Sequence, residues 1–133
     1  MAGIMIALSP FFATPASADT LTLTTLRKPH VDDAKDAIAP IMKSVWADEI
    51  AATPGSFSFT YAIFELVGSR YLVSAFRSGS ACRPDECDWQ VQRLTADYKI
   101  AAKGKRIAAC GAQNGVAVED KKLLICGQEA GLP

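Results

Sequence analysis

Short alternations of hydrophobic and polar residues run along most of the chain and predict strands that each bury one face. In the first of them, Asp19–Leu26, leucine and threonine alternate. The other predicted strands are Phe57–Ile63, Tyr71–Phe76, Trp89–Leu94, Arg106–Cys110, Val116–Val118 and Lys122–Cys126. Turn-forming residues separate several of them, in particular Val67-Gly68-Ser69 and Gln113-Asn114-Gly115. The pattern therefore predicts an antiparallel meander.

One segment between the first two strands has helical spacing instead. Asp32 and Asp33 offer an N-cap and negative charge in the first turn. The apolar residues that would share one helix face are Ala34, Ile38, Ile41, Met42, Val45 and Trp46. Pro40 should kink this helix or split it in two, and Thr53-Pro54-Gly55 ends it. We therefore expect an α+β fold, in which an N-terminal, Pro-kinked helix packs on one face of an antiparallel sheet.

The length of 133 residues, half of them hydrophobic, predicts one domain over residues 19–133. Residues 1–18 have the pattern of a cleavable export signal: the apolar stretch Gly3–Phe12 is too short to span a bilayer, and Ala16-Ser17-Ala18 suits signal peptidase. Pro10 and Pro15 disfavour the alternative of a buried N-terminal helix. We expect a periplasmic or secreted protein that does not stay in the membrane after cleavage.

The charge balance narrows the class of partner. Fourteen basic and fourteen acidic side chains give a formal net charge of zero. Nothing in this balance favours nucleic acid or a broad attraction to anionic lipid. A protein partner would have to be recognised locally, and a homodimer is one of the states that the sequence leaves open.

Four cysteines fit disulfides in an exported domain, and they allow three pairings. Cys82 and Cys87 enclose four residues, a ring that closes locally, whereas Cys110 and Cys126 each end a β-like run and are each followed by glycine. The spacing therefore predicts Cys82–Cys87 and Cys110–Cys126. In the loop-entropy view the second bond would contribute roughly 3 kcal/mol.

Metal, redox and catalytic chemistry are each disfavoured by the residues present. The C-x4-C spacing does not match common zinc sites, and His30 is far away in the sequence. A redox pair would need C-x-x-C before a helix. Neighbouring acids such as Asp85 and Glu86 are typical of caps and turns, and His30 is more simply an exposed loop residue than a catalytic base. We predict no catalytic residues, no metal site and no cofactor.

The segment Ser80–Cys87, SACRPDEC, resembles the S-A-C-K-P-H-x-C loop of the Ivy-type periplasmic inhibitors of vertebrate (c-type) lysozyme. The stretch DTLTLTTLRK from Asp19 is similar to the strand that opens the mature domain of that family. The resemblance implies an α+β domain with a central antiparallel sheet. It also implies a disulfide-closed loop that enters the lysozyme cleft and blocks it.

In that family the loop histidine engages the catalytic acids of the enzyme, but here Asp85 stands at that position. Arg83, whose planar guanidinium suits carboxylates, is the candidate to replace it. The predicted partner-binding residues are Arg83, Pro84, Asp85, Glu86 and Trp89. Trp89 is equally natural in a core. The alternative function is a periplasmic structural or adaptor domain, in which the loop is only a staple and its charges are solvated.

Overall fold

The computed structural model describes residues 19–27, 35–79 and 81–133. The predicted export signal (1–18) lies outside these residues, and so do His30, Asp32, Asp33 and Ser80. Within the described residues the chain forms ten strands and two helices. The strands are β1 (Asp19–Thr20), β2 (Thr24–Arg27), β3 (Ser58–Leu66), β4 (Ser69–Arg77), β5 (Cys87–Leu94), β6 (Ile100–Lys103), β7 (Ile107–Ala109), β8 (Val116–Glu119), β9 (Lys122–Ile125) and β10 (Gln128–Ala130). The helices are α1 (Ala39–Val45) and α2 (Ala47–Ala51).

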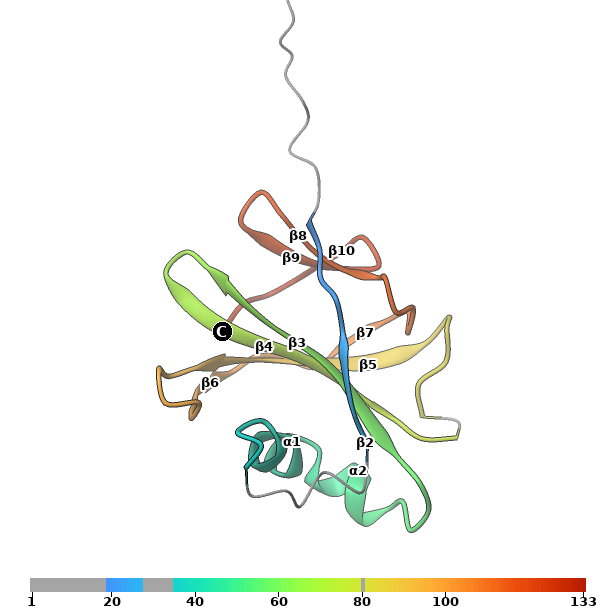
Figure 1. The fold of residues 1–133 in the computed structure, drawn as a ribbon. Coiled ribbons are helices and arrows are strands. Elements are labelled where there is room, and N and C mark those ends of the chain that lie inside the picture. The colour runs from blue at the N-terminus through green and yellow to red at the C-terminus, as the bar shows by residue number, and fades with distance from the viewer. Residues whose placement is uncertain (1–18, 28–34, 80) are drawn as a thin grey trace, which may run out of the picture.

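The strands form two antiparallel sheets, and the helices make a third layer (Figure 1). The small sheet has the order β1-β8-β9-β10. The large sheet has the order β2-β3-β4-β5-β6, and β7 also pairs with β5. In Figure 1 the large sheet crosses the centre of the molecule, with the small sheet on one side and both helices on the other. Consecutive strands of the large sheet are therefore neighbours in space.

The strands of the large sheet place alternate side chains on opposite faces, and buried apolar residues lie on both faces. Each face is therefore covered by another layer. Phe64, Val73 and Trp89 point toward the small sheet and pack in one cluster with its buried residues Leu123 and Ile125. These side chains form a closed apolar layer between the two sheets. The two sheets thus share one core, and the sequence pattern did not predict that the strands divide into two sheets.

The opposite face of the large sheet packs against the helices. Phe59, Leu72 and Phe76 form a second cluster with Met42 of α1 and with Trp46. Trp46 and Phe76 stack with ring centroids 6.2 Å apart. The helical layer is therefore anchored by a few large side chains.

The predicted α+β class is wrong, because the protein is mostly antiparallel β-sheet and its helices are too short to define a class. α1 has seven residues and α2 has five. Pro40 does not kink a long helix but lies in the first turn of α1, where its missing N–H has no helical partner to lose. The helical conformation is interrupted instead at Trp46, whose φ of −112° and ψ of 27° separate α1 from α2. The class is two antiparallel sheets with two short helices.

The N-terminal strand also differs from its prediction over Asp19–Leu26. β1 pairs with β8 in the small sheet. β2 pairs with β3 in the large sheet, where Leu26 of β2 lies opposite Phe59 of β3. Leu21 and Leu23, between the two strands, pack against the cluster that joins the sheets. The single strand predicted from this alternation is therefore two short strands, one in each sheet. β6 and β10 were not predicted, because their sequences, IAAK and QEA, show no alternation of hydrophobic and polar residues.

Two-residue turns close three of the hairpins. In the β3–β4 turn both central residues have positive φ, 51° for Val67 and 77° for Gly68. This geometry matches the right-handed twist of the flanking strands and normally favours glycine, asparagine or aspartate. The predicted turn at Val67-Gly68-Ser69 is confirmed. Both central residues also have positive φ in the β8–β9 turn, at Asp120 and Lys121, and in the β9–β10 turn, at Cys126 and Gly127.

Gln92 on β5 is the least favourable polar group of the described core. Its side chain is 0% exposed, and neither its amide nitrogen nor its amide oxygen has a hydrogen-bond partner. A buried polar group without a partner costs about 1–3 kcal/mol. Gln92→Met keeps the shape and removes the amide, so we expect the free energy of unfolding to rise by about 1 kcal/mol. Urea denaturation measures this change.

Gln90, two residues earlier on the same strand, provides the matched control. Its amide nitrogen donates a hydrogen bond to the carbonyl oxygen of Val45, 3.2 Å away. Gln90→Met should therefore lower the free energy of unfolding by about 0.5–1.5 kcal/mol. If Gln92→Met is the more destabilising of the two, the Gln92 amide has a stabilising partner and our interpretation is wrong.

Candidate functional site

Residues 82–87 form a closed hairpin, which we call the finger. The predicted Cys82–Cys87 disulfide is confirmed, with the two Cα atoms 4.4 Å apart. The N–H of Arg83 donates to the carbonyl oxygen of Glu86 at 2.8 Å, and the N–H of Glu86 donates back to that of Arg83 at 3.2 Å. Pro84 sits inside this turn, where its ring fixes φ. The finger is therefore closed by one covalent bond and two backbone hydrogen bonds.

The second predicted disulfide, Cys110–Cys126, is also confirmed. Cys110 follows β7 in the large sheet, and Cys126 lies in the turn between β9 and β10 of the small sheet. The bond therefore links the two sheets covalently. It also fixes the position of Gly111, the next residue in the chain.

The finger packs directly against the backbone of Gly111, which we call the seat of the finger. Its N–H donates to the carbonyl oxygen of Pro84 at 3.1 Å. A Cβ atom at this position would lie 2.3 Å from the carbonyl oxygen of Arg83 and 2.8 Å from the sulfur of Cys82. No side chain fits between them, so only glycine allows this approach.

Two side chains of the large sheet hold the Cys110-Gly111 segment in place. The indole N–H of Trp89 donates to the carbonyl oxygen of Cys110 at 2.8 Å, and Nη2 of Arg77 donates to that of Gly111 at 3.0 Å. The Arg77 guanidinium also lies 5.9 Å from the centroid of the Trp89 ring. Trp89 is 0% exposed, so it supports the finger from the core and has no surface to offer a partner.

The tip of the finger carries three exposed charges. The side chains of Arg83, Asp85 and Glu86 are 57%, 84% and 71% exposed. Nη2 of Arg83 lies 2.7 Å from a carboxylate oxygen of Glu86, and Nε of Arg83 lies 3.8 Å from one of Asp85. The predicted partner-binding cation is thus paired within its own loop. An exposed pair of this kind contributes about 0–1 kcal/mol, so a partner can displace it.

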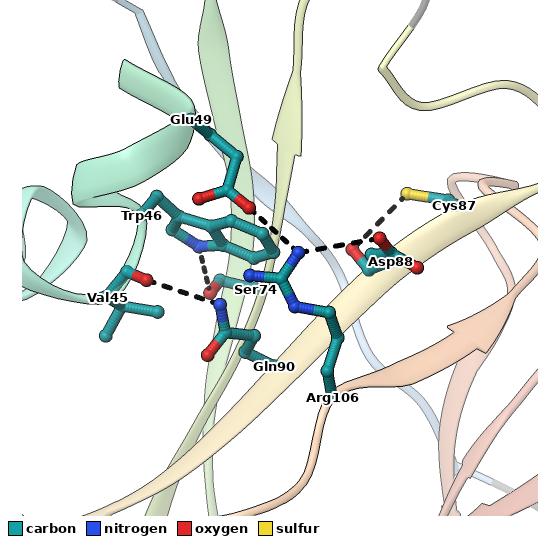
Figure 2. Close-up of polar contacts among 8 residues, drawn as sticks. All are labelled: Val45, Trp46, Glu49, Ser74, Cys87, Asp88, Gln90 and Arg106. Atoms are coloured by element: carbon teal, nitrogen blue, oxygen red, sulfur yellow. Dashed lines mark hydrogen bonds and ion pairs between the residues drawn. The ribbon is translucent and has the colours of Figure 1, made fainter. Parts of the chain in front are cut away.

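Arg106 connects the helices to the strand that begins at the finger, as Figure 2 shows. Its Nη1 atom lies 2.8 Å from a carboxylate oxygen of Glu49 and 3.5 Å from one of Asp88. The same guanidinium lies 5.2 Å from the ring centroid of Trp46, whose indole N–H donates to the hydroxyl of Ser74 at 3.0 Å. The base of β5 is therefore fixed from the helical side as well.

Sequence reasoning found the finger and both disulfides but missed Arg77, Arg106 and Gly111. The only local signal for Gly111 was that glycine follows Cys110. The described residues hold no group of three His, Cys, Asp or Glu side chains suited to a metal ion. Neither of the described helices is long and apolar enough to cross a bilayer.

Substitution of Gly111 tests the seat. Gly111→Ala should lower the free energy of unfolding by about 1–3 kcal/mol, because the added methyl group overlaps backbone that cannot move freely. Gly79→Ala is the matched control, since a Cβ there meets nothing within 4 Å, and it should change stability by less than about 0.5 kcal/mol. Thermal and urea unfolding of both variants measure the difference. Equal stability of the two would show that the finger does not rest on Gly111.

Comparison of the chain with protein-family models, with curated proteins and with solved structures gave no match. The resemblance to the Ivy-type inhibitors therefore rests on the finger sequence and on the opening stretch from Asp19. The function has to be argued from how the finger is held and from the charges that it presents.

Proposed function

We propose that this protein is an exported, protein-binding inhibitor that inserts the finger into the cleft of a lysozyme. The observation that carries the proposal is the contrast between the base and the tip of the finger. The base is fixed by a disulfide and by the Gly111 seat, whereas Arg83, Asp85 and Glu86 at the tip are exposed. A preorganised loop loses little conformational entropy when it docks.

Two features support an exported location. The four cysteines form two disulfides and none is free, which is typical of proteins that fold in an oxidising compartment. The first eighteen residues have the sequence pattern of a cleavable signal. A periplasmic or secreted inhibitor would meet a muramidase in that compartment.

The charges at the tip define how docking would proceed. Asp85 replaces the histidine of the resembling family, and its carboxylate would be repelled by the catalytic acids of the enzyme. Arg83 is the cation of the tip and must exchange Glu86 for an enzyme carboxylate. Because the Arg83–Glu86 pair is exposed, this exchange costs little. The finger therefore docks with Arg83 foremost.

The second candidate is a structural or adaptor domain in which the finger is only a staple. The observation that favours it is the pairing of Arg83 with Glu86 and Asp85 within the finger, which leaves this cation without need of a partner. In that case the exposed charges serve solubility alone. An inhibition assay separates the two candidates.

The oxidised protein should inhibit at least one member of a panel of c-type, g-type and i-type lysozymes. Arg83→Ala should weaken that inhibition about tenfold or more, because it removes a charge-assisted hydrogen bond. Arg70→Ala is the matched control: Arg70 also pairs with an exposed carboxylate, that of Glu65 on the neighbouring strand, but it lies at the start of β4. Its inhibition should be unchanged. No inhibition by the wild-type protein would overturn the proposal.

Asp85→His tests the family resemblance with the same assay. It restores the residue type of the S-A-C-K-P-H-x-C loop at an exposed position and removes a negative charge. If the finger enters the cleft as the resemblance implies, inhibition should strengthen about tenfold, since a repulsive contact becomes an attractive one. Weaker inhibition by this variant would mean that Asp85 itself binds the target.

A further inference from the structure

An open hollow of about 500 Å³ lies beside the finger, and the described residues that line it include two arginines and no acid. Its lining residues are Arg27, Ser56, Phe57, Ser58, Arg77, Ser78 and Gly79. Two arginines and three serines thus line one open hollow. Four other hollows formed by described residues each include at least one carboxylate.

The register of the large sheet brings the two arginines together. Arg27 on β2 lies opposite Ser58 on β3, and Ser58 lies opposite Arg77 on β4. Directly opposed residues in antiparallel strands place their side chains on the same face. Adjacent strands are about 4.8 Å apart, so the two arginine backbones are about 10 Å apart. Two long cations therefore flank one serine on one face of the sheet.

Neither arginine forms an ion pair with a carboxylate of the described chain, in contrast to Arg70, Arg83 and Arg106. Arg77 is half-buried, and this burial lowers the pKa of its guanidinium. Its two hydrogen bonds within the described structure go to neutral acceptors, the hydroxyl of Thr60 and the carbonyl oxygen of Gly111. A guanidinium has five N–H donors, so donors remain for a ligand.

We propose that this hollow is a binding site for an oxyanion, either a carboxylate or a tetrahedral group such as phosphate or sulfate. Arg77 and Arg27 supply the charge, and their planar forks match the spacing of paired oxygen atoms. The hydroxyls of Ser56, Ser58 and Ser78 supply additional donors around the same centre. The assignment does not depend on the inhibitory function, because it concerns the face of the sheet beside the finger and not the tip.

The hollow is connected to the finger at two points. Ser78 lines the hollow, and its backbone carbonyl oxygen accepts a hydrogen bond at 2.8 Å from the N–H of Ala81, one residue before the finger. Arg77 also donates to the carbonyl oxygen of Gly111, the seat of the finger. An oxyanion that holds Arg77 in position therefore also supports the base of the finger.

Anion titrations followed by ¹H–¹⁵N NMR test the site on the oxidised full chain. Sodium acetate and sodium sulfate serve as the carboxylate and tetrahedral probes, with sodium chloride added to hold the ionic strength constant. Signals of the Ser58, Ser78 and Gly79 amides and of the Arg77 Nε–H should shift and saturate with one dissociation constant. The probe that binds more tightly identifies the geometry of the oxyanion.

Arg27→Ala should weaken this binding about tenfold, because one of the two cations is lost. It is the preferred variant, since Arg27 is exposed, whereas Arg77 also supports Gly111. Arg77→Lys keeps the charge but loses the fork and should weaken binding as well. Arg70→Ala should leave binding unchanged. Shifts that grow linearly with both probes, or that are the same in Arg27→Ala, would overturn the assignment whether or not the protein inhibits a lysozyme.

Discussion

The close approach of the Gly111 backbone to the finger is the contact on which the arrangement depends. A Cβ atom there would overlap the Arg83 carbonyl oxygen at 2.3 Å, so the finger rests directly on the peptide of another segment. That segment is held by the Cys110–Cys126 disulfide, by the buried Trp89 and by Arg77. The stability of the core is thereby transmitted to an exposed loop, which gives the finger one shape before it meets a partner.

Local charge, rather than net charge, distinguishes the surfaces around this loop. The whole chain has a formal net charge of zero, yet the tip carries one cation and two acids. The hollow beside it has Arg27 and Arg77 in its lining and no carboxylate among the lining residues that the structure describes. Two adjacent surfaces of different sign can recognise different groups, and neither is visible in the composition. Recognition by this protein is therefore a property of a few side chains placed by the sheet register.

The sequence predicted what depends on neighbouring residues and failed where distant residues decide. Cysteine spacing was sufficient for both disulfides, and Val67-Gly68 was sufficient for its turn. The helix prediction was wrong because Pro40 lies in the first turn of α1 and because the helix ends at Trp46, which is buried against the sheet. The roles of Trp89 and Gly111 arise only when strands far apart in the sequence meet, so no local pattern could reveal them.

Native-state hydrogen exchange at the Gly111 and Glu86 amides tests most directly whether the finger is held rigidly on its seat. Both N–H groups donate within this unit, to Pro84 and to Arg83. In the oxidised protein they should exchange as slowly as amides in the centre of β4 and β5, through the same cooperative opening. Exchange of the Gly111 amide at the rate of an unprotected peptide, while the central strands stay protected, would contradict the account.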